Sequence, residues 1–161
     1  MKIVDYYSKE NWGDGVWQKE PDGAFWIDDE TNYCCMVRRN TYGTWAGYVG
    51  VDNNHPFFCL NKRHHRYNTI LVHGGVTFSD YDVKSDGEFY PPIRRWWIGF
   101  DCFKNVDLVP TKLAELPAVK NIHTPIKTAE YRTYTFVIDQ TNQLAYQLGC
   151  VDTRKNLKRS I

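Results

Sequence analysis

The chain lacks a long apolar run. No apolar stretch in its 161 residues approaches the ~20 residues that a membrane-spanning helix needs. The N-terminal stretch turns acidic and polar after a few residues, so it has no apolar core of signal-peptide length. We therefore expect no contact with a membrane. We also expect the chain to stay in the compartment in which it is made.

The cysteines lack the number and spacing of a disulfide framework. There are five of them, an odd number, and no two have the CxxC spacing of a redox or zinc motif. In a reducing compartment they are most simply buried free thiols. We therefore predict no metal and no cofactor; the alternative is a zinc site assembled from cysteine and histidine across the fold.

A strong excess of either charge is also absent. The net charge is +1, which argues against bulk electrostatic capture of nucleic acid. The C-terminal segment 150–161 is basic, and we interpret it as a solvated tail carrying Arg154, Lys155, Lys158 and Arg159. The chain has no internal repeat and no low-complexity segment, and its length matches a single domain of ~100–150 residues.

Aromatic residues are abundant, at 16% of the chain, and most of them are tryptophan and tyrosine. Residues 1–30 have no helical period, so they predict an irregular arm or short edge strands held to the body by tryptophans. Residues 32–102 are rich in β-forming residues and predict a mainly antiparallel sheet. The predicted strands are 32–39 and 44–51, joined as a hairpin, then 69–78, interrupted by Gly74 and Gly75, and 94–102.

The last third of the chain changes character. Apolar residues recur at helical spacing over 128–148, with one weak turn at Thr141, and Gly149 follows as a natural helix C-cap. A helix of this length must bury its apolar stripe, and the sheet is the available partner. The predicted fold class is therefore α+β, a single domain over residues 1–161 with one long C-terminal amphipathic helix.

Three clusters place a titratable side chain next to glycine, on or near a strand. They are Gly47-Tyr48-Val49-Gly50-Val51 leading to His55, Val72-His73-Gly74-Gly75, and Trp96-Trp97-Ile98-Gly99-Phe100-Asp101-Cys102 with Asp107 beyond. Histidines and carboxylates from separate elements can form an acid–base pair, a metal site or a set of hydrogen bonds to a polar ligand. Each residue alone also fits ordinary packing, so the prediction depends on their convergence.

These clusters, kept in order and preceded by Glu20-Pro21-Asp22, resemble a family of small proteins of tailed bacteriophages. The resemblance also includes Tyr131-Arg132 before the helix, and it spans roughly residues 12 to 148. It implies a viral protein acting in the cytoplasm of a host bacterium, and it implies no particular reaction.

The sequence departs from that family after Asp101-Cys102. The family pattern continues with a small residue and a histidine, whereas this chain has Phe103 and Lys104. Lysine keeps a hydrogen-bond donor and adds a positive charge. The departure therefore favours recognition of an anion over proton abstraction.

We expect a phage accessory protein that binds a small polar or nucleotide-like host molecule, with sequestration of an immune signal as its role. Tyrosine and tryptophan faces would stack on bases while cationic donors hold phosphates. One alternative is a hydrolase or phosphodiesterase that uses His55, His73 and Asp101; another is an inhibitor that binds a host protein, and a homo-oligomer fits all three. The predicted ligand-binding residues are Tyr48, His55, His73, Gly74, Gly75, Trp96, Trp97, Asp101 and Lys104.

Overall fold

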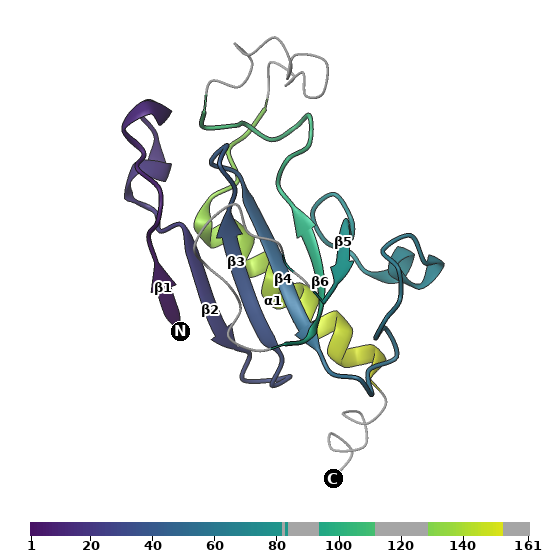
Figure 1. Ribbon diagram of the computed structural model, residues 1–161. Helices are drawn as coiled ribbons and strands as arrows, with labels where there is room; N and C mark the ends of the chain where they lie inside the picture. Colours follow the sequence, from purple (N-terminus) through teal and green to yellow (C-terminus); the bar gives the residue numbers. More distant parts are fainter. Residues whose placement is uncertain (82, 84–93, 112–128, 153–161) are drawn as a thin grey trace.

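The computed structural model describes residues 1–81, 83, 94–111 and 129–152 (Figure 1). These residues form one antiparallel sheet of six strands, in the order β1-β2-β3-β4-β6-β5, with a long helix across one face. The α+β prediction is confirmed. The elements are β1 (Lys2–Val4), β2 (Gly23–Ile27), β3 (Cys34–Arg39), β4 (Trp45–Val51), β5 (Phe78–Asp80), β6 (Trp96–Asp101) and α1 (Tyr134–Val151).

The predicted hairpin is present as β3 and β4. Met36 pairs with Tyr48 at the centre of the ladder. The turn between the strands is closed by Asn40, whose side-chain oxygen accepts hydrogen bonds from the backbone N–H groups of Tyr42 (3.0 Å) and Thr44 (3.2 Å). An asparagine side chain that bonds to the backbone two residues on is a common way to start such a turn.

The predicted strand over 69–78 is wrong for most of its length. A short 3-10 helix, His65–Thr69, precedes it, and only the last residue, Phe78, belongs to β5. Gly74 and Gly75 have φ values of 67° and 77°, which lie in the left-handed region and cannot continue a strand. The intervening residues form a loop that runs beside α1.

The predicted helix is present, but it is shifted toward the C-terminus. It begins at Tyr134 because Thr133 caps it, with its hydroxyl accepting from the N–H of Phe136 (3.2 Å). Gly149 lies inside the helix rather than ending it. A Cβ there would come within 2.9 Å of the Thr31 side chain, so the glycine permits close packing.

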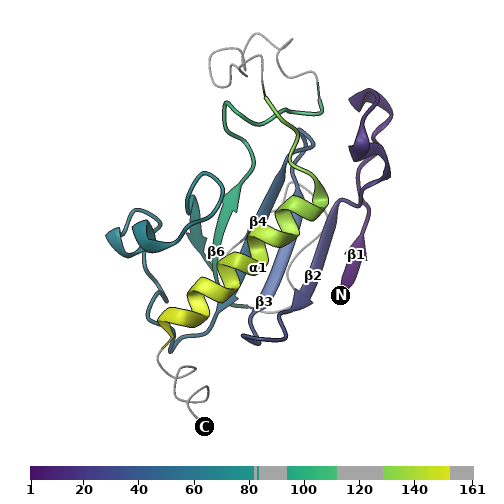
Figure 2. The ribbon, with the colours of Figure 1, turned by 180° about the vertical axis from the view of Figure 1, so that it is seen from behind.

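Helix α1 crosses the sheet over β4 and β3 (Figure 2). A Cβ on Gly47 of β4 would lie 2.2 Å from the Thr141 hydroxyl oxygen, so glycine is needed where the helix comes closest. Thr141, which looks like a weak point in the stripe, is buried, and its hydroxyl donates to the Val137 carbonyl (2.7 Å). The main core lies between this helix face and the sheet.

Both faces of the sheet bury apolar side chains. The helix-side core takes alternate residues of each strand, such as Trp96 and Ile98 of β6. The opposite face has a smaller core that includes Met36, Tyr48 and Trp97. Alternate residues of one strand point to opposite faces, so Trp96 and Trp97 belong to different cores.

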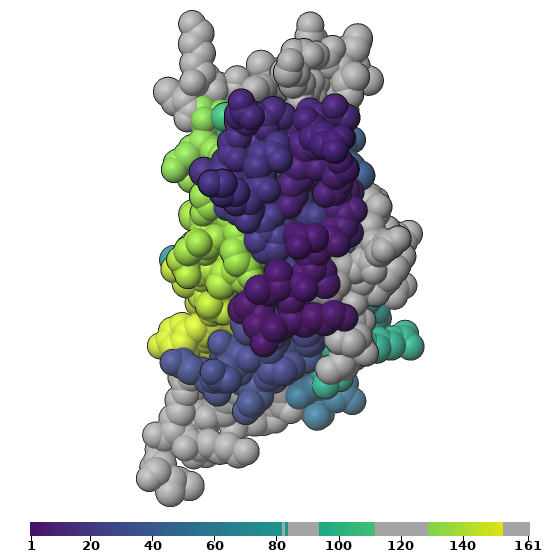
Figure 3. Space-filling model, turned by 90° about the vertical axis from the view of Figure 1, so that its left-hand side faces the viewer, coloured from purple at the N-terminus to yellow at the C-terminus, as the bar shows by residue number. Residues whose placement is uncertain are grey.

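The N-terminal arm contains a short edge strand, which is one of the two alternatives that its sequence predicts. It contains β1, β2 and the short 3-10 helices Glu10–Trp12 and Val16–Lys19, and it covers one edge of the sheet (Figure 3). At the other end of the chain, Val151 is still helical, so the predicted tail begins inside α1; its basic residues lie outside the described ranges. No helix in the described part of the chain has the length and apolar character to cross a membrane.

Candidate functional site

His73 lies in the loop between the 3-10 helix and β5, beside the N-terminal half of α1. Its backbone N–H donates to the Gln140 side chain (2.8 Å), and its ring packs edge-on against Phe136. Its Nε2 lies 2.9 Å from Oδ2 of Asp107, and the histidine side chain is 13% exposed. The loop thus holds an imidazole at the surface, against a buried carboxylate.

Asp107 is buried and accepts hydrogen bonds from three directions. His73 Nε2 and the Lys104 backbone N–H contact one carboxylate oxygen (both 2.9 Å), and Arg132 Nε contacts the other (2.8 Å). Burial alone would raise the pKa of Asp107, but these hydrogen bonds outweigh it and hold the pKa below the usual value. An ionised carboxylate can only accept, so Nε2 of His73 carries the proton that it shares with Asp107.

Asp101 and Lys104 form a second ion pair in the same region, with Nζ 3.0 Å from Oδ1. The Thr77 hydroxyl donates to the other oxygen of Asp101 (2.9 Å). The Lys104 side chain lies across Gly74, where a Cβ would come within 2.5 Å of Lys104 Cε. Gly74 therefore provides both a left-handed turn and room for the lysine, and Lys104 is 33% exposed.

We call the residues Gly74, His73, Thr77, Asp101, Lys104, Asp107 and Arg132 the His73 network. The Asp107 carboxylate is buried and the Asp101 carboxylate is partly exposed, and both accept hydrogen bonds from donors of the chain. The donors of the network have capacity left: among the described residues, Nδ1 of His73 has no partner, Lys104 Nζ contacts one carboxylate, and Arg132 contacts two carboxylates and the Phe136 ring. An ammonium group has three N–H bonds and a guanidinium five, so the network can still donate to a ligand.

Cys102 adjoins the network but does not suit nucleophilic chemistry. The thiol is buried, and burial, together with the nearby charges of Asp107 and Asp101, raises its pKa. A thiolate is the reactive form, so this cysteine is an inert core residue. Cys34 and Cys35 are buried as well, whereas Cys59 and Cys150 are exposed and form no disulfide. Within the described ranges, no group of three His, Cys, Asp or Glu side chains could hold a metal ion.

His55 is placed elsewhere. It is buried, its Nδ1 accepts from the N–H of Phe57 (3.0 Å), and its Nε2 lies 3.0 Å from the Leu148 carbonyl oxygen. Because Nδ1 accepts, Nε2 must donate, and the ring closes one of the carbonyls left unpaired at the end of α1. His55 therefore has a structural role at the helix C-terminus.

The expected meeting of His55, His73 and Asp101 in one concavity does not occur. His73 contacts α1 near Gln140 and His55 contacts it at Leu148, which places the two contacts ~12 Å apart along the helix axis. His73 and Asp101 do lie in one network, joined through Lys104 and Asp107. Of the three residues, only His55 is excluded from it.

The aromatic residues predicted to stack on a ligand are buried instead. Trp97 is fully enclosed with Tyr48 in the core on the face opposite the helix, and Phe78 packs edge-on against Tyr48. Trp96 lies in the helix-side core. These rings contribute to packing on two faces, and in this structure they do not form a common wall. Gly75 adjoins the network and turns the loop.

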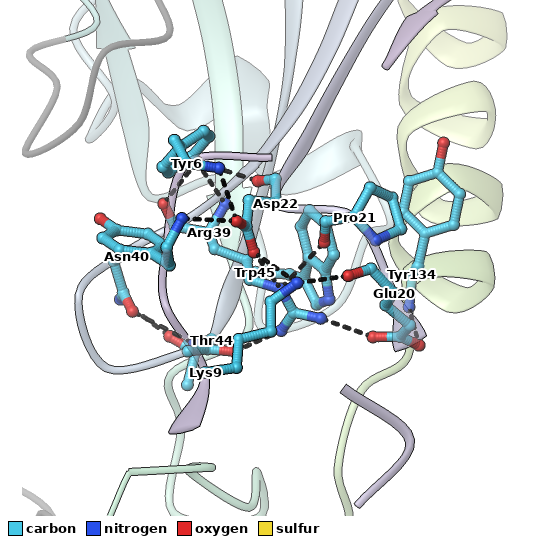
Figure 4. Close-up of polar contacts among 12 residues, drawn as sticks. Tyr6, Lys9, Glu20, Pro21, Asp22, Arg39, Asn40, Thr44, Trp45 and Tyr134 are labelled. Atoms are coloured by element: carbon cyan, nitrogen blue, oxygen red, sulfur yellow. Dashed lines mark hydrogen bonds and ion pairs between the residues drawn. The ribbon is translucent and has the colours of Figure 1, made fainter. Parts of the chain in front are cut away.

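A second polar cluster surrounds Arg39 of β3 (Figure 4). The guanidinium is fully buried and contacts Glu20 (2.7 Å) and Asp22 (3.4 Å), and it lies 4.2 Å from the centre of the Trp45 ring. Its remaining N–H groups donate to the backbone carbonyls of residues 21 and 43 and to the Tyr131 hydroxyl. We call Arg39, Glu20, Asp22, Lys9, Trp45 and Tyr131 the Arg39 network.

The Arg39 network attaches the N-terminal arm to the rest of the fold. Glu20 accepts from the first N–H of α1, that of Tyr134 (2.8 Å), and from the Tyr131 hydroxyl (2.6 Å). Asp22 accepts from the backbone N–H groups of residues 6 and 7 and pairs with Lys9 (2.9 Å). The two cations and two carboxylates balance, so this network has a structural role.

Some of these residues carried a signal in the sequence that could have been used. Asp107 and Arg132 both appear in the motifs, but their separation in the sequence does not indicate that their side chains are in contact. Arg39 has no motif of its own and looks like an ordinary strand residue. Glu20 and Asp22 occur in the Glu-Pro-Asp motif. The structure gives this motif the role of attaching the N-terminal arm to the rest of the fold.

No protein-family model, curated protein or solved structure matches this chain.

Proposed function

We propose that this protein binds a small polar, nucleotide-like molecule through the His73 network. The observation that supports the proposal is the direction of the hydrogen bonds. The buried carboxylate of Asp107 and the partly exposed carboxylate of Asp101 accept hydrogen bonds from the chain on both of their oxygens, whereas Lys104, Arg132 and His73 are partly exposed and retain unused bonding positions. A ligand rich in hydrogen-bond acceptors, such as phosphate oxygens, complements these groups.

The charges of the network set the expected mode of binding. Lys104 and Arg132 are each paired with a carboxylate, and the net charge of the chain is only +1. Long-range attraction is therefore weak, and affinity would come from directed hydrogen bonds at short range. We expect a modest dependence of affinity on salt.

The motif resemblance to phage proteins extends this proposal to a biological role. In such a protein, acting in the cytoplasm of the host, the ligand would be a host nucleotide signal. Sequestering an immune signal needs tight binding without turnover. The ion-paired Lys104, which stands where the family pattern has a histidine, supports holding a ligand rather than transferring a proton.

The test is to recover the ligand. The purified protein is incubated with a bacterial nucleotide extract, separated from unbound compounds, denatured, and analysed by mass spectrometry. We expect one intact compound from the native protein and at least tenfold less from Lys104→Met, because a charge-assisted hydrogen bond contributes about 1.5–3 kcal/mol. Lys62→Met, which removes an exposed lysine of the loop before the 3-10 helix, is the matched control. The absence of any released compound would exclude the proposal.

A second candidate is the hydrolase or phosphodiesterase, and one observation favours it. Asp107 fixes the orientation of His73 through Nε2, as a carboxylate orients a general base in many hydrolases, and Nδ1 has no partner among the described residues. His55 would have no part in it, because both of its ring nitrogens are bonded in the core.

The same experiment separates this candidate from binding alone. An enzyme would consume the compound in the extract and release products, whereas a binding protein returns the compound intact. His73→Ala should abolish turnover and leave a cooperative unfolding transition. If consumption is unchanged in His73→Ala, the hydrolase is excluded.

A further inference from the structure

A separate depression lies on the outer side of the C-terminal half of α1. Its volume is about 880 Å³, and it is bounded by α1, by the end of β2 with the turn that follows, and by the loop before His73. Figure 3 shows part of this side, where the C-terminal half of α1 (yellow-green) lies near the dark purple N-terminal strand. We call it the α1 groove; its lining includes Trp26, Ile27, Asp29, Glu30, Leu71 and Tyr146.

The α1 groove gathers exposed apolar side chains. The described part of the chain has eight large exposed hydrophobic residues, and four of them line this groove: Met1 (68% exposed), Ile27 (45%), Leu71 (76%) and Tyr146 (51%). Single exposed apolar residues are ordinary on a protein surface, whereas a cluster marks a binding surface.

Two of the walls are held in place. The indole N–H of Trp26 donates to the Asn142 side chain (3.2 Å). Gln147 holds Leu71 by both backbone groups, accepting from its N–H (2.7 Å) and donating to its carbonyl (2.9 Å). The backbone that carries the most exposed of these apolar side chains is therefore held in place, and binding would not require ordering this backbone first.

The charged side chains of the groove have one sign. Asp28, Asp29 and Glu30 line it, and none of its lining residues in the described part of the chain is lysine, arginine or histidine. Asp28 is engaged in the turn, where it accepts from the backbone and hydroxyl of Thr31. Asp29 and Glu30 are exposed and extend the apolar surface with negative charge. The complement is a positively charged segment with an apolar anchor.

We propose that the α1 groove is a docking surface for a segment of a partner protein that carries apolar side chains flanked by lysine or arginine. This surface is distinct from the His73 network and does not depend on the ligand proposed for it. The apolar anchor would contact Leu71, Trp26 and Tyr146, and the basic residues would face Asp29 and Glu30.

The experiment uses the full-length protein and two short synthetic peptides, one of leucine and lysine and one of leucine and glutamate. Isothermal titration calorimetry should show binding of the lysine peptide and none of the glutamate peptide. The double variant Asp29→Lys/Glu30→Lys should weaken binding about tenfold, since each exposed ion pair contributes up to about 1 kcal/mol. Leu71→Ser should weaken it by at least tenfold through loss of the anchor.

Matched controls lie outside the groove. Asp14→Lys reverses an exposed carboxylate and Val16→Ser removes an exposed apolar side chain, and both should bind the lysine peptide as the native protein does. Equal binding of the two peptides would overturn the proposal, as would an equal loss in the control variants. Self-association of the free protein that Leu71→Ser abolishes, measured by analytical ultracentrifugation, would also overturn it and assign the groove to a second copy of the chain.

Discussion

The Arg39 network and the His73 network share a short segment, 130–133, and use the same kinds of residue in different ways. Tyr131 contacts Arg39, and its neighbour Arg132 contacts Asp107. In the first network the cation is enclosed and every nitrogen of its guanidinium is bonded. In the second, the carboxylate is enclosed and the cations reach the surface.

This difference shows which polar clusters can bind a ligand. An enclosed cation whose nitrogens are all bonded within the fold cannot reach another molecule, so it can only stabilise the fold. An enclosed carboxylate that positions partly exposed donors leaves those donors available. Changes in the Arg39 network should therefore act on stability, and changes at the surface of the His73 network should act on binding.

The largest effect is expected from Arg39→Met. Methionine keeps much of the side-chain volume but leaves the largely buried Glu20 carboxylate without its cation and the buried Asp22 carboxylate with Lys9 alone. Breaking a buried ion pair from one side costs about 3–5 kcal/mol, and we expect this loss in the free energy of unfolding measured with urea. A loss of unfolding free energy as small as that of the exposed-site variant Lys62→Met would mean that the Arg39 network is not enclosed within the fold.

A smaller loss is expected from Asp107→Asn, about 1–3 kcal/mol at neutral pH, because His73 and Arg132 lose a charged acceptor. The loss should depend on pH. The pKa of Asp107 is lowered in the folded protein, so its contribution is complete above the unfolded pKa of ~3.9 and disappears as the pH falls through the folded value.

Urea unfolding at a series of acidic pH values checks this prediction. The difference between native protein and Asp107→Asn should be constant near neutral pH and should shrink as the pH falls below ~4. A difference that stays the same throughout the acid range would show that Asp107 is not held ionised by its three donors.

The smallest effect on stability is expected from Lys104→Met. Lys104 and Asp101 form a partly exposed ion pair, and such pairs contribute about 0–1 kcal/mol. Methionine can still cover Gly74, so the unfolding midpoint should change little while ligand recovery falls. Loss of stability comparable to that of Asp107→Asn would make Lys104 a structural residue and remove the contrast between the two networks.

Local patterns in the sequence predicted most of the fold. The β3–β4 hairpin, β6 and α1 follow from β-forming residues, a turn and a helical stripe, and they are present. The third strand was wrong because Gly74 and Gly75 adopt left-handed φ values. The predicted C-cap role of Gly149 was wrong, because this glycine lies inside α1. It permits close packing against Thr31, which is distant in the sequence.

The candidate site was predictable only in part. His73, Gly74, Asp101 and Lys104 were selected from the sequence and lie together in the structure. His55 has the same chemistry but reaches the other end of α1, and no local pattern distinguishes the two histidines. Trp96 and Trp97 were both predicted to contact the ligand, whereas alternation along β6 sends them to opposite faces.

The central claim, that His73 faces a ligand while His55 belongs to the core, is tested most directly by NMR of the histidine side chains. Isotope-labelled protein is observed before and after addition of a bacterial nucleotide extract. The account predicts that the imidazole resonances of His73 shift and that those of His55 stay in place. Unchanged His73 resonances in an extract that still yields a bound compound would contradict it and place the binding site elsewhere in the molecule.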